Sequence, residues 1–274
     1  MSNLTRRISI SLLALLLMQV HSFAKEIEFA QVSDIHYTLK NSTLDKYLYF
    51  LSLSISKKQP KFVMFLGDNV EKSQEENVIG FMRMIHSIRE PYYLVLGNKD
   101  AHSLNGIDKE VYLDIVTTFN RNQENDKSFY YFRPNKDVVC VVLDDSSNFA
   151  MSSHGEIPDE QLIWLEKLLK KNSKKLFLIF HHTPVLPPRD DYKLSMVNTE
   201  KYQEILNKYN NILLISSGHY HQGAVQTDEK GIRHISAPAF KNMPHSYQLI
   251  KIKYDKKSYK SPKNVEITVT PVKV

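Results

Sequence analysis

The stretch SSGHYHQG (residues 216–223) follows directly on the apolar run NILLI (211–215), and together they predict a buried strand that ends in a polar site. Within this stretch, His219 and His221 are separated by a single residue. Residues i and i+2 of an extended segment point to the same side, so both imidazoles would leave the strand end together. Two exposed loop histidines would have the same spacing, so the pair alone does not establish a metal site.

The rest of the chain alternates between apolar runs and helix-like stretches. Six runs are typical of strands, and they occupy residues 26–33, 61–67, 92–97, 138–144, 175–180 and 211–216. Helices are expected between them, over residues 43–57, 73–88, 108–120, 158–171 and 199–209. From residue 223 onward, apolar and polar residues alternate, which indicates further strands. This order predicts an α/β fold whose sheets end in antiparallel hairpins.

Metal-ligand residue types follow five of the six predicted strands. The five segments read VSDIHY, LGDNVE, LGNKDAH, FHHTPV and SGHYH, and they contain Asp34, His36, Asp68, Asn98, His181, His182, His219 and His221. Turns favour Asp, Asn and Gly in any protein, so one such strand end carries little information. In α/β folds, however, ligands gather outside the carboxyl ends of the strands. Five such ends, two of them with ligands paired at i and i+2, predict a metal site.

The types of the candidate ligands limit the kind of metal site. None is a thiolate, which excludes a closed structural zinc site built on cysteines. Imidazoles with carboxylates suit Fe, Mn, Zn, Ni or Co without selecting among them. Seven ligands, counting one of the adjacent His181 and His182, are too many for one tetrahedral ion but suit two divalent ions about 3.5–4 Å apart. One carboxylate would then bridge the ions, and Asp68 is the natural bridge because it follows the tight turn at Gly67.

The pattern DIH…GDNVE…GNKD…HHTP…SGHYH, which spans residues 34–221, resembles the calcineurin-like metallophosphoesterase superfamily. The resemblance implies a four-layer α/β/β/α sandwich with a dinuclear metal site at the carboxyl ends of the strands. The helix IPDEQLIWLEKLLKK (157–171) is similar to one in the subgroup of class III cyclic nucleotide phosphodiesterases and acid sphingomyelinase-like proteins.

Carried over by position, the resemblance implies a role for each ligand. One metal would take Asp34, His36 and His221, and Asp68 would bridge both metals. The other metal would take Asn98, His219 and one histidine of the segment HHTP. Family members often have His-x-Pro there, which favours His182, with His181 as the alternative.

The sequence departs from the family pattern at two positions. Lys99 stands where the family usually has a histidine that contacts phosphate or protonates the leaving group. A lysine can place a positive charge on a phosphoryl oxygen, but a pKa near 10.4 makes it a poor proton donor and acceptor at neutral pH. His102 is an alternative for that role. Glu71 stands where purple acid phosphatases have a ligand tyrosine, which argues against a ferric centre of that type.

These features predict a phosphoesterase that uses Lys99, Asp68 and a metal-bridging hydroxide to hydrolyse small-molecule or lipid phosphate esters, with diesters favoured. A broad phosphomonoesterase is the alternative, and a binding protein that keeps the metal fold without turnover is a weaker one. Asp100 is a candidate for orienting the imidazoles, or else a turn residue. The loops 146–156 and 186–200 are expected to shape the substrate entrance, with His154, Arg189 and Tyr220 as candidate contacts.

The first 24 residues have the layout of a secretory signal. Arg6 and Arg7 precede an apolar run of about 13 residues, which is shorter than the about 20 that a membrane span needs, and Ser22-Phe23-Ala24 follows. We expect cleavage after Ala24, a periplasmic or secreted protein without a stable membrane anchor, and one metallophosphoesterase domain over residues 25–274.

The cysteine content and the net charge indicate no further site. Its one cysteine, Cys140, lies in an apolar run and is expected in the core. The net charge is +6, or +4 without the two arginines of the signal, and its lysines are scattered through the sequence. A nucleic-acid site would require clustered basic residues interleaved with aromatic ones, and the sequence shows no such stripe.

Overall fold

The computed structural model describes residues 25–274 except 121, 124–126 and 256. The predicted signal peptide, residues 1–24, therefore lies outside the described residues. The strands are β1 (Lys25–Val32), β2 (Val63–Phe65), β3 (Tyr92–Leu94), β4 (Tyr130–Phe132), β5 (Val138–Val142), β6 (Leu176–Phe180), β7 (Ile212–Ser217), β8 (Ala224–Thr227), β9 (Arg233–Ser236), β10 (Ser246–Tyr254) and β11 (Glu266–Lys273). The α-helices are α2 (Ser42–Lys58), α3 (Glu75–Ile85), α4 (Lys109–Phe119), α5 (Asp159–Lys171) and α6 (Glu200–Lys208).

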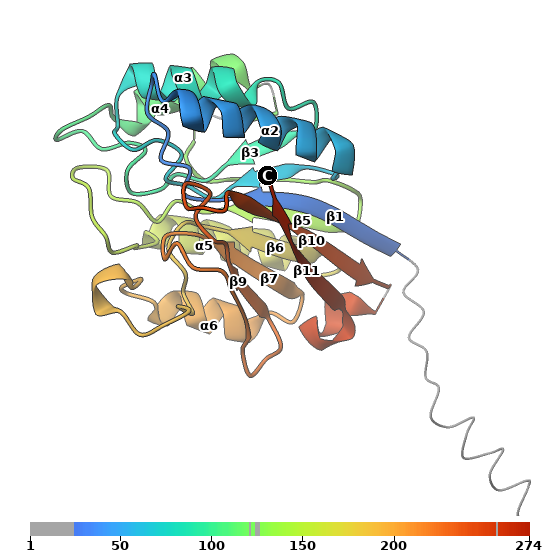
Figure 1. Cartoon of the computed structure of the whole chain (residues 1–274). Helices are drawn as coiled ribbons and strands as arrows, with labels where there is room; N and C mark the ends of the chain where they lie inside the picture. Colours follow the sequence, from blue (N-terminus) through green and yellow to red (C-terminus); the bar gives the residue numbers. More distant parts are fainter. Residues whose placement is uncertain (1–24, 121, 124–126, 256) are drawn as a thin grey trace, which may run out of the picture.

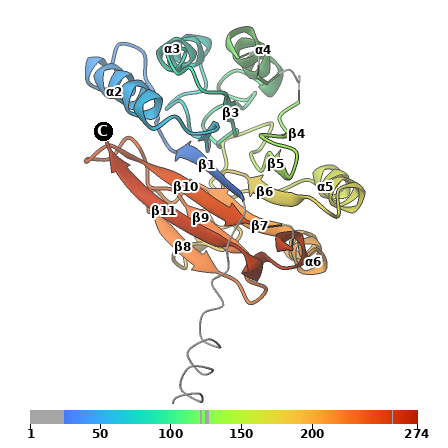
Figure 2. The ribbon, with the colours of Figure 1, turned by 90° about the vertical axis from the view of Figure 1, so that its right-hand side faces the viewer.

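The strands form two sheets that pack face to face (Figures 1 and 2). The first sheet has the order β11-β10-β1-β2-β3, and the second has the order β4-β5-β6-β7-β9-β8. Helices α2, α3 and α4 cover the outer face of the first sheet, and α5 and α6 cover the outer face of the second. The predicted four-layer α/β/β/α arrangement is confirmed.

Alternate residues of the central strands contribute to different layers of the core. In β1, Ile27 and Phe29 pack between the sheets, whereas Ala30 and Val32 pack against the helices of the first sheet. Burial on both faces explains why these strands read as continuous apolar runs in the sequence. Cys140 of β5 lies between the sheets and is fully buried, as expected.

Helix α5 shows how the outer layers form. Pro158 precedes it, and Asp159 and Glu160 lie in its first turn, where their charges favour the positive end of the helix dipole. Four leucines on one side are buried against the second sheet: Leu162, Leu165, Leu168 and Leu169. The predicted apolar face is therefore the buried face.

The central strands run parallel, so their carboxyl ends meet at one edge of the sandwich. Strands β1, β2 and β3 are parallel in the first sheet, as are β5, β6, β7 and β9 in the second. The pairs β8–β9 and β10–β11 are antiparallel, as predicted for the region after residue 223. Strand β4, which the sequence pattern did not predict, pairs antiparallel with β5. No helix of the described chain is both long and apolar enough to cross a membrane.

Candidate metal centre

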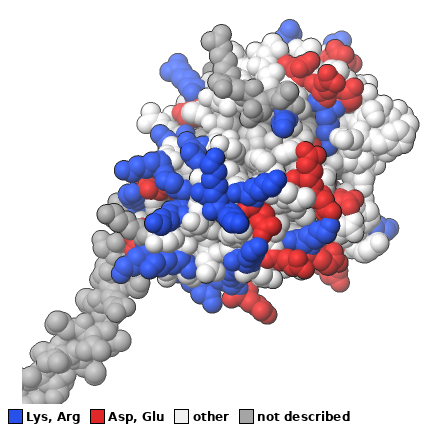
Figure 3. All heavy atoms as spheres, turned by 180° about the vertical axis from the view of Figure 1, so that it is seen from behind, with Lys and Arg blue, Asp and Glu red and all other residues white. Residues whose placement is uncertain are grey.

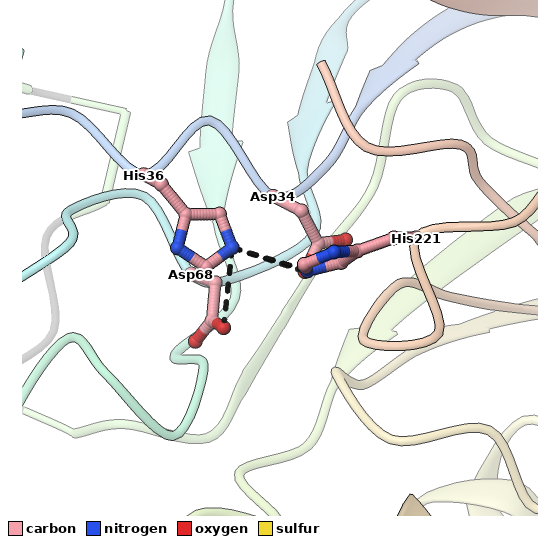
Figure 4. A group of neighbouring side chains, drawn as sticks. All are labelled: Asp34, His36, Asp68 and His221. Atoms are coloured by element: carbon pink, nitrogen blue, oxygen red, sulfur yellow. Dashed lines mark hydrogen bonds and ion pairs between the residues drawn. The ribbon is translucent and has the colours of Figure 1, made fainter. Parts of the chain in front are cut away.

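Two groups of metal-ligand side chains meet at the carboxyl ends of the parallel strands. Asp34, His36, Asp68 and His221 each place one ligand atom within 4.8 Å of the others (Figure 4). Asp68, His182 and His219 form a second group that meets the same limit. Asp68 belongs to both groups, so its carboxylate lies where a bridge between two ions would be.

Each group is assembled from strands that are distant in sequence. Asp34 and His36 follow β1, Asp68 follows β2, and His219 and His221 follow β7. These five residues all have a positive φ, between 48° and 68°. This region is strained for residues other than glycine, and such strain often accumulates at functional sites.

The first group brings lone pairs together at close range. The Nε2 atoms of His36 and His221 are 3.2 Å apart, and Nε2 of His221 is 3.3 Å from Oδ1 of Asp34. This Oδ1 atom is buried and has no hydrogen-bond partner among the described residues. The other oxygen, Oδ2, accepts hydrogen bonds from the Ser33 hydroxyl and the His219 backbone N–H. The arrangement leaves Oδ1 free for a cation.

The second group has the same character. Nε2 of His182 lies 3.2 Å from Nδ1 of His219 and 3.5 Å from Oδ1 of Asp68. Asn98, which follows β3, has a buried amide oxygen without a hydrogen-bond partner in the described part of the chain. Buried polar atoms are normally hydrogen-bonded, so the unpartnered oxygens of Asp34 and Asn98 fit metal coordination. The donor set as a whole fits two divalent cations.

Three imidazoles are oriented by hydrogen bonds outside the ligand groups. His36 donates from Nδ1 to Oε2 of Glu71 (2.6 Å), and His182 donates from Nδ1 to the Leu66 carbonyl (2.8 Å). His219 donates from Nε2 to the Ser153 carbonyl (2.9 Å). Each ring thereby directs its remaining nitrogen toward the ligand groups, where that nitrogen can bind a cation once it is deprotonated.

The structure separates the two adjacent histidines of the segment HHTP. His182 belongs to the second group, whereas His181 donates from Nδ1 to the Thr183 carbonyl and lies outside both groups of the described residues. The ring of His181 packs edge-on against Tyr202. This placement favours His182 as the ligand, and the choice between the two histidines stays a prediction.

The ionisation of the buried groups shows that the site attracts positive charge. Burial raises the pKa of the Asp68 carboxyl, but the charges of His182 and His36 outweigh burial and hold that pKa below its usual range. Burial lowers the pKa of His182, but the carboxylates of Asp68 and Asp34 outweigh burial and raise that pKa to about 10. A proton on His182 thus balances these carboxylates, and a divalent cation would do so more fully.

Glu71 connects a predicted ligand to Lys99. Its Oε2 accepts from His36, and its Oε1 accepts from the Lys99 ammonium at 2.9 Å. The backbone N–H of Lys99 donates to Oδ1 of Asp68 (2.9 Å). The predicted charge on a phosphoryl oxygen would therefore come from a lysine whose ammonium is paired with a carboxylate. In the sequence, Glu71 is notable only for standing in place of a ligand tyrosine, and no local signal indicates this contact.

Two buried carboxylates hold the backbone around the site. Asp100 accepts from the backbone N–H groups of Gly97 (2.8 Å) and Val70 (3.0 Å), so it serves as a turn residue that joins two strand ends. Asp145 accepts from the backbone N–H groups of His182 and Thr183. Asp145 was not identified from the sequence, although it follows the one central run, 138–144, that was assigned no site residue.

The loops beside the metal centre form a polar hollow of about 640 Å³, lined in part by Asp145, Ser152, His154 and Glu156. His154 contacts the Ser195 carbonyl (3.3 Å), which joins the two loops predicted to shape the entrance. Arg189 and Tyr220 pack on each other, with the guanidinium 5.5 Å from the ring centre. His102 is buried, and its Nδ1 has no hydrogen-bond partner in the described chain.

Comparison with known proteins points to one family. The family model described as calcineurin-like phosphoesterase matches residues 27–223. A probable glycerophosphodiester phosphodiesterase of Arcobacter nitrofigilis is 28% identical over 70% of this chain and 71% of its own length. A probable cyclic nucleotide phosphodiesterase of Coxiella burnetii is 27% identical over 71% of this chain and 76% of its own. A dimetal phosphatase from Danio rerio has a similar fold, with a TM-score of 0.68 and 18% identity over 84% of this chain and 93% of its own.

Proposed function

Because the chain belongs to the calcineurin-like phosphoesterase family, and is therefore a hydrolase of phosphoric esters, we propose that it hydrolyses phosphodiesters with two divalent metal ions. The observation that carries the proposal is the pair of ligand groups that share Asp68. Two relatives of comparable length are named as probable phosphodiesterases, which supports diesters over monoesters.

The proposed ligands divide between the two ions. Asp34, His36 and His221 would hold one ion, Asn98, His182 and His219 would hold the other, and Asp68 would contact both. When bound, the ions would polarise the phosphoryl oxygens and make an attacking water acidic enough to react near neutral pH. Fe, Mn, Zn, Ni and Co all fit the imidazole and carboxylate donors.

The side chains contribute to this chemistry by orientation and charge. Glu71, Leu66 and Ser153 accept one N–H from each of three imidazoles, which directs the other ring nitrogens toward the ions. Lys99 places a positive charge at the margin of the site, where Glu71 limits its movement. Substrates of this site would be small-molecule or lipid phosphate esters, whose charge the Lys99 ammonium complements.

We also propose that the protein is exported and that residues 1–24 are removed. The support is the order of arginines, apolar run and small residues at the start of the sequence. Expression in a bacterial host followed by mass determination would test this, because cleavage after Ala24 leaves Lys25 as the first residue. An intact amino terminus in the extracytoplasmic fraction would contradict cleavage.

The activity is tested with a substrate panel on protein reconstituted separately with each candidate metal. We expect turnover of bis-p-nitrophenyl phosphate to exceed that of p-nitrophenyl phosphate. The reverse order would identify a phosphomonoesterase, and full metal content without turnover of either ester would identify a binding protein.

Asp68→Ala provides the sharpest variant, because the proposed bridge serves both ions. We expect turnover at background level and a metal content of one ion or none, measured by elemental analysis. Asp137→Ala, which removes a half-buried carboxylate paired with Lys25 far from the ligand groups, is the matched control. Near-normal turnover and two bound ions in Asp68→Ala would contradict the dinuclear site.

A further inference from the structure

A dense group of basic side chains lies near the amino ends of the parallel strands, at the opposite end of the strands from the metal centre. Figure 3 shows lysines and arginines gathered on the face seen from behind. We define the basic surface as Arg133, Lys136, Lys167, Lys170, Lys171, Lys174, Lys175 and Lys208, of which all but the half-buried Lys175 are exposed. Arg133, Lys136 and Lys208 are distant in sequence from the lysines of residues 167–175, and the fold brings them together.

Two shallow hollows that share one lysine place five of these residues together, and a third hollow lies at Lys174. One is lined by Arg133, Lys167 and Lys171 together with Tyr131 and Trp164. A second shares Lys167 and adds Lys170 and Lys208, and a third is lined by Lys174 and Lys25. The carboxylates that line these hollows are Asp137, Glu166 and Asp255, and the first two are already paired with Lys25 and Lys208. The surface therefore has a large excess of positive charge.

Aromatic and aliphatic side chains are interleaved with the basic ones. Tyr131 is 43% exposed and Ile163 is 56% exposed, and the half-buried Trp164 packs against the Tyr131 ring. The Arg133 guanidinium lies 5.6 Å from the centre of the Tyr131 ring. Amphipathic aromatic rings beside lysines and arginines are typical of the boundary between lipid headgroups and acyl chains.

We propose that the basic surface docks the protein on an anionic phospholipid bilayer. The positive charge of the basic surface attracts acidic headgroups. The exposed Ile163 and the aromatic rings can insert at the boundary between the headgroups and the acyl chains. A nucleic-acid backbone would satisfy the charge but would leave Ile163 without a favourable contact. If the proposed cleavage after Ala24 occurs, the new α-amino group of Lys25 adds a further positive charge beside Lys174.

Docking in this orientation has a consequence for the substrate. Lys136 lies two residues before β5 and Lys175 directly before β6, whereas His182 follows β6 at its other end. A strand of five residues is about 17 Å long, so the metal centre would point away from the bilayer. The docked protein would therefore act on soluble phosphate esters and not on the phospholipids to which it is bound.

Vesicle co-sedimentation tests the docking. We expect binding to vesicles that contain phosphatidylglycerol, little binding to pure phosphatidylcholine, and loss of binding between about 0.05 M and about 0.5 M NaCl. Lys170→Glu/Lys171→Glu should weaken binding by about tenfold or more. Lys40→Glu/Lys46→Glu is the matched control, because it reverses two exposed lysines at the amino-terminal end of α2, which lies toward the carboxyl ends of the strands and away from the basic surface.

The single tryptophan of the chain, Trp164, reports which face is bound. Brominated phosphatidylglycerol should quench its fluorescence when the protein binds vesicles, and quenching should disappear at high salt. The proposal would be overturned if the two double variants weakened vesicle binding equally, or if vesicles bound without quenching Trp164. It would also be overturned if a DNA oligonucleotide bound and vesicles did not. Salt-resistant binding that both double variants retain would also overturn it, because the apolar run in residues 8–20 would then account for binding.

Discussion

At the scale of single residues, the two adjacent histidines of the segment HHTP have different surroundings. His182 is directed at Asp68 and His219, whereas His181 is enclosed by the second sheet and Tyr202. We expect His182→Ala to lose one metal ion and most activity, because it removes a proposed ligand. His181→Ala should keep both ions and lose mainly stability. Elemental analysis and thermal unfolding measure the two effects, and the opposite ranking in metal content would assign the ligand to His181.

Glu71 and Lys99 form a pair whose two members should have separable effects. Glu71→Gln removes the charge that holds the His36 ring and the Lys99 ammonium, so we expect metal affinity to fall by roughly 10–100-fold. Lys99→Ala should keep both ions and lower kcat by about 10²–10³-fold if its charge contributes to the transition state. Glu76→Gln, an exposed glutamate in the first turn of α3, is the control for the charge change.

Metal affinity and kcat measured on both variants and on the double variant separate the roles. If Lys99 acts only through Glu71, the double variant will have the kcat of Glu71→Gln alone. If kcat is unchanged in Lys99→Ala, on esters with good and with poor leaving groups, then Lys99 does not contribute to catalysis.

At the scale of elements, the turns after β2 and β3 approach each other so closely that side chains are excluded between them. A Cβ on Gly97 would lie 2.0 Å from the backbone nitrogen of Asp68. We therefore expect Gly97→Ala to displace the proposed bridging ligand, with a loss of about 1–3 kcal/mol or more in the free energy of unfolding and a reduced metal content. At Gly223 the nearest atom would be 3.4 Å away, so Gly223→Ala should be mild. Similar unfolding curves for the two variants would contradict this reading of the turns.

At the scale of the whole molecule, the ligand groups couple metal binding and stability to pH. The pKa of His182 is raised to about 10, above the 6.5 of an unperturbed histidine, because Asp68 and Asp34 outweigh burial. In metal-stripped protein, the stability that this proton contributes is fully present below pH 6.5 and is lost as pH rises toward 10. Metal binding at His182 must displace the proton, so metal affinity should increase with pH over the same range.

Calorimetric titration of the metal in buffers of different ionisation enthalpy would measure the displaced proton. We expect release of about one proton from His182 at pH 7.5, in addition to any from metal-bound water. The His181→Ala variant is the control, because burial lowers the pKa of His181 and that ring lies outside both ligand groups of the described residues. Proton release at pH 7.5 that is the same in His182→Ala as in the unmodified protein would contradict the assignment.

The local pattern of the sequence was sufficient to predict an α/β fold and most of the candidate site, whereas the four-layer arrangement followed from the family resemblance. Apolar runs between helix-like stretches predict an α/β fold, because strands buried on both faces must be apolar along their whole length. The pairs Asp34/His36 and His219/His221 are visible without a structure, since a strand end directs residues i and i+2 to one side. These signals depend only on neighbours along the chain.

Only the tertiary structure decided which distant groups meet. Strand β10 pairs with β1 although more than two hundred residues separate them, and no local pattern specifies that partner. Glu71 reaches His36, Asp145 reaches His182, and the lysines of α5 reach Arg133, through contacts that exist only once the sheets have packed. Hydrogen bonds and charges act over a few ångströms in space, whatever the distance along the chain. The orientation of the ligands and the basic surface could therefore be found only from the folded structure.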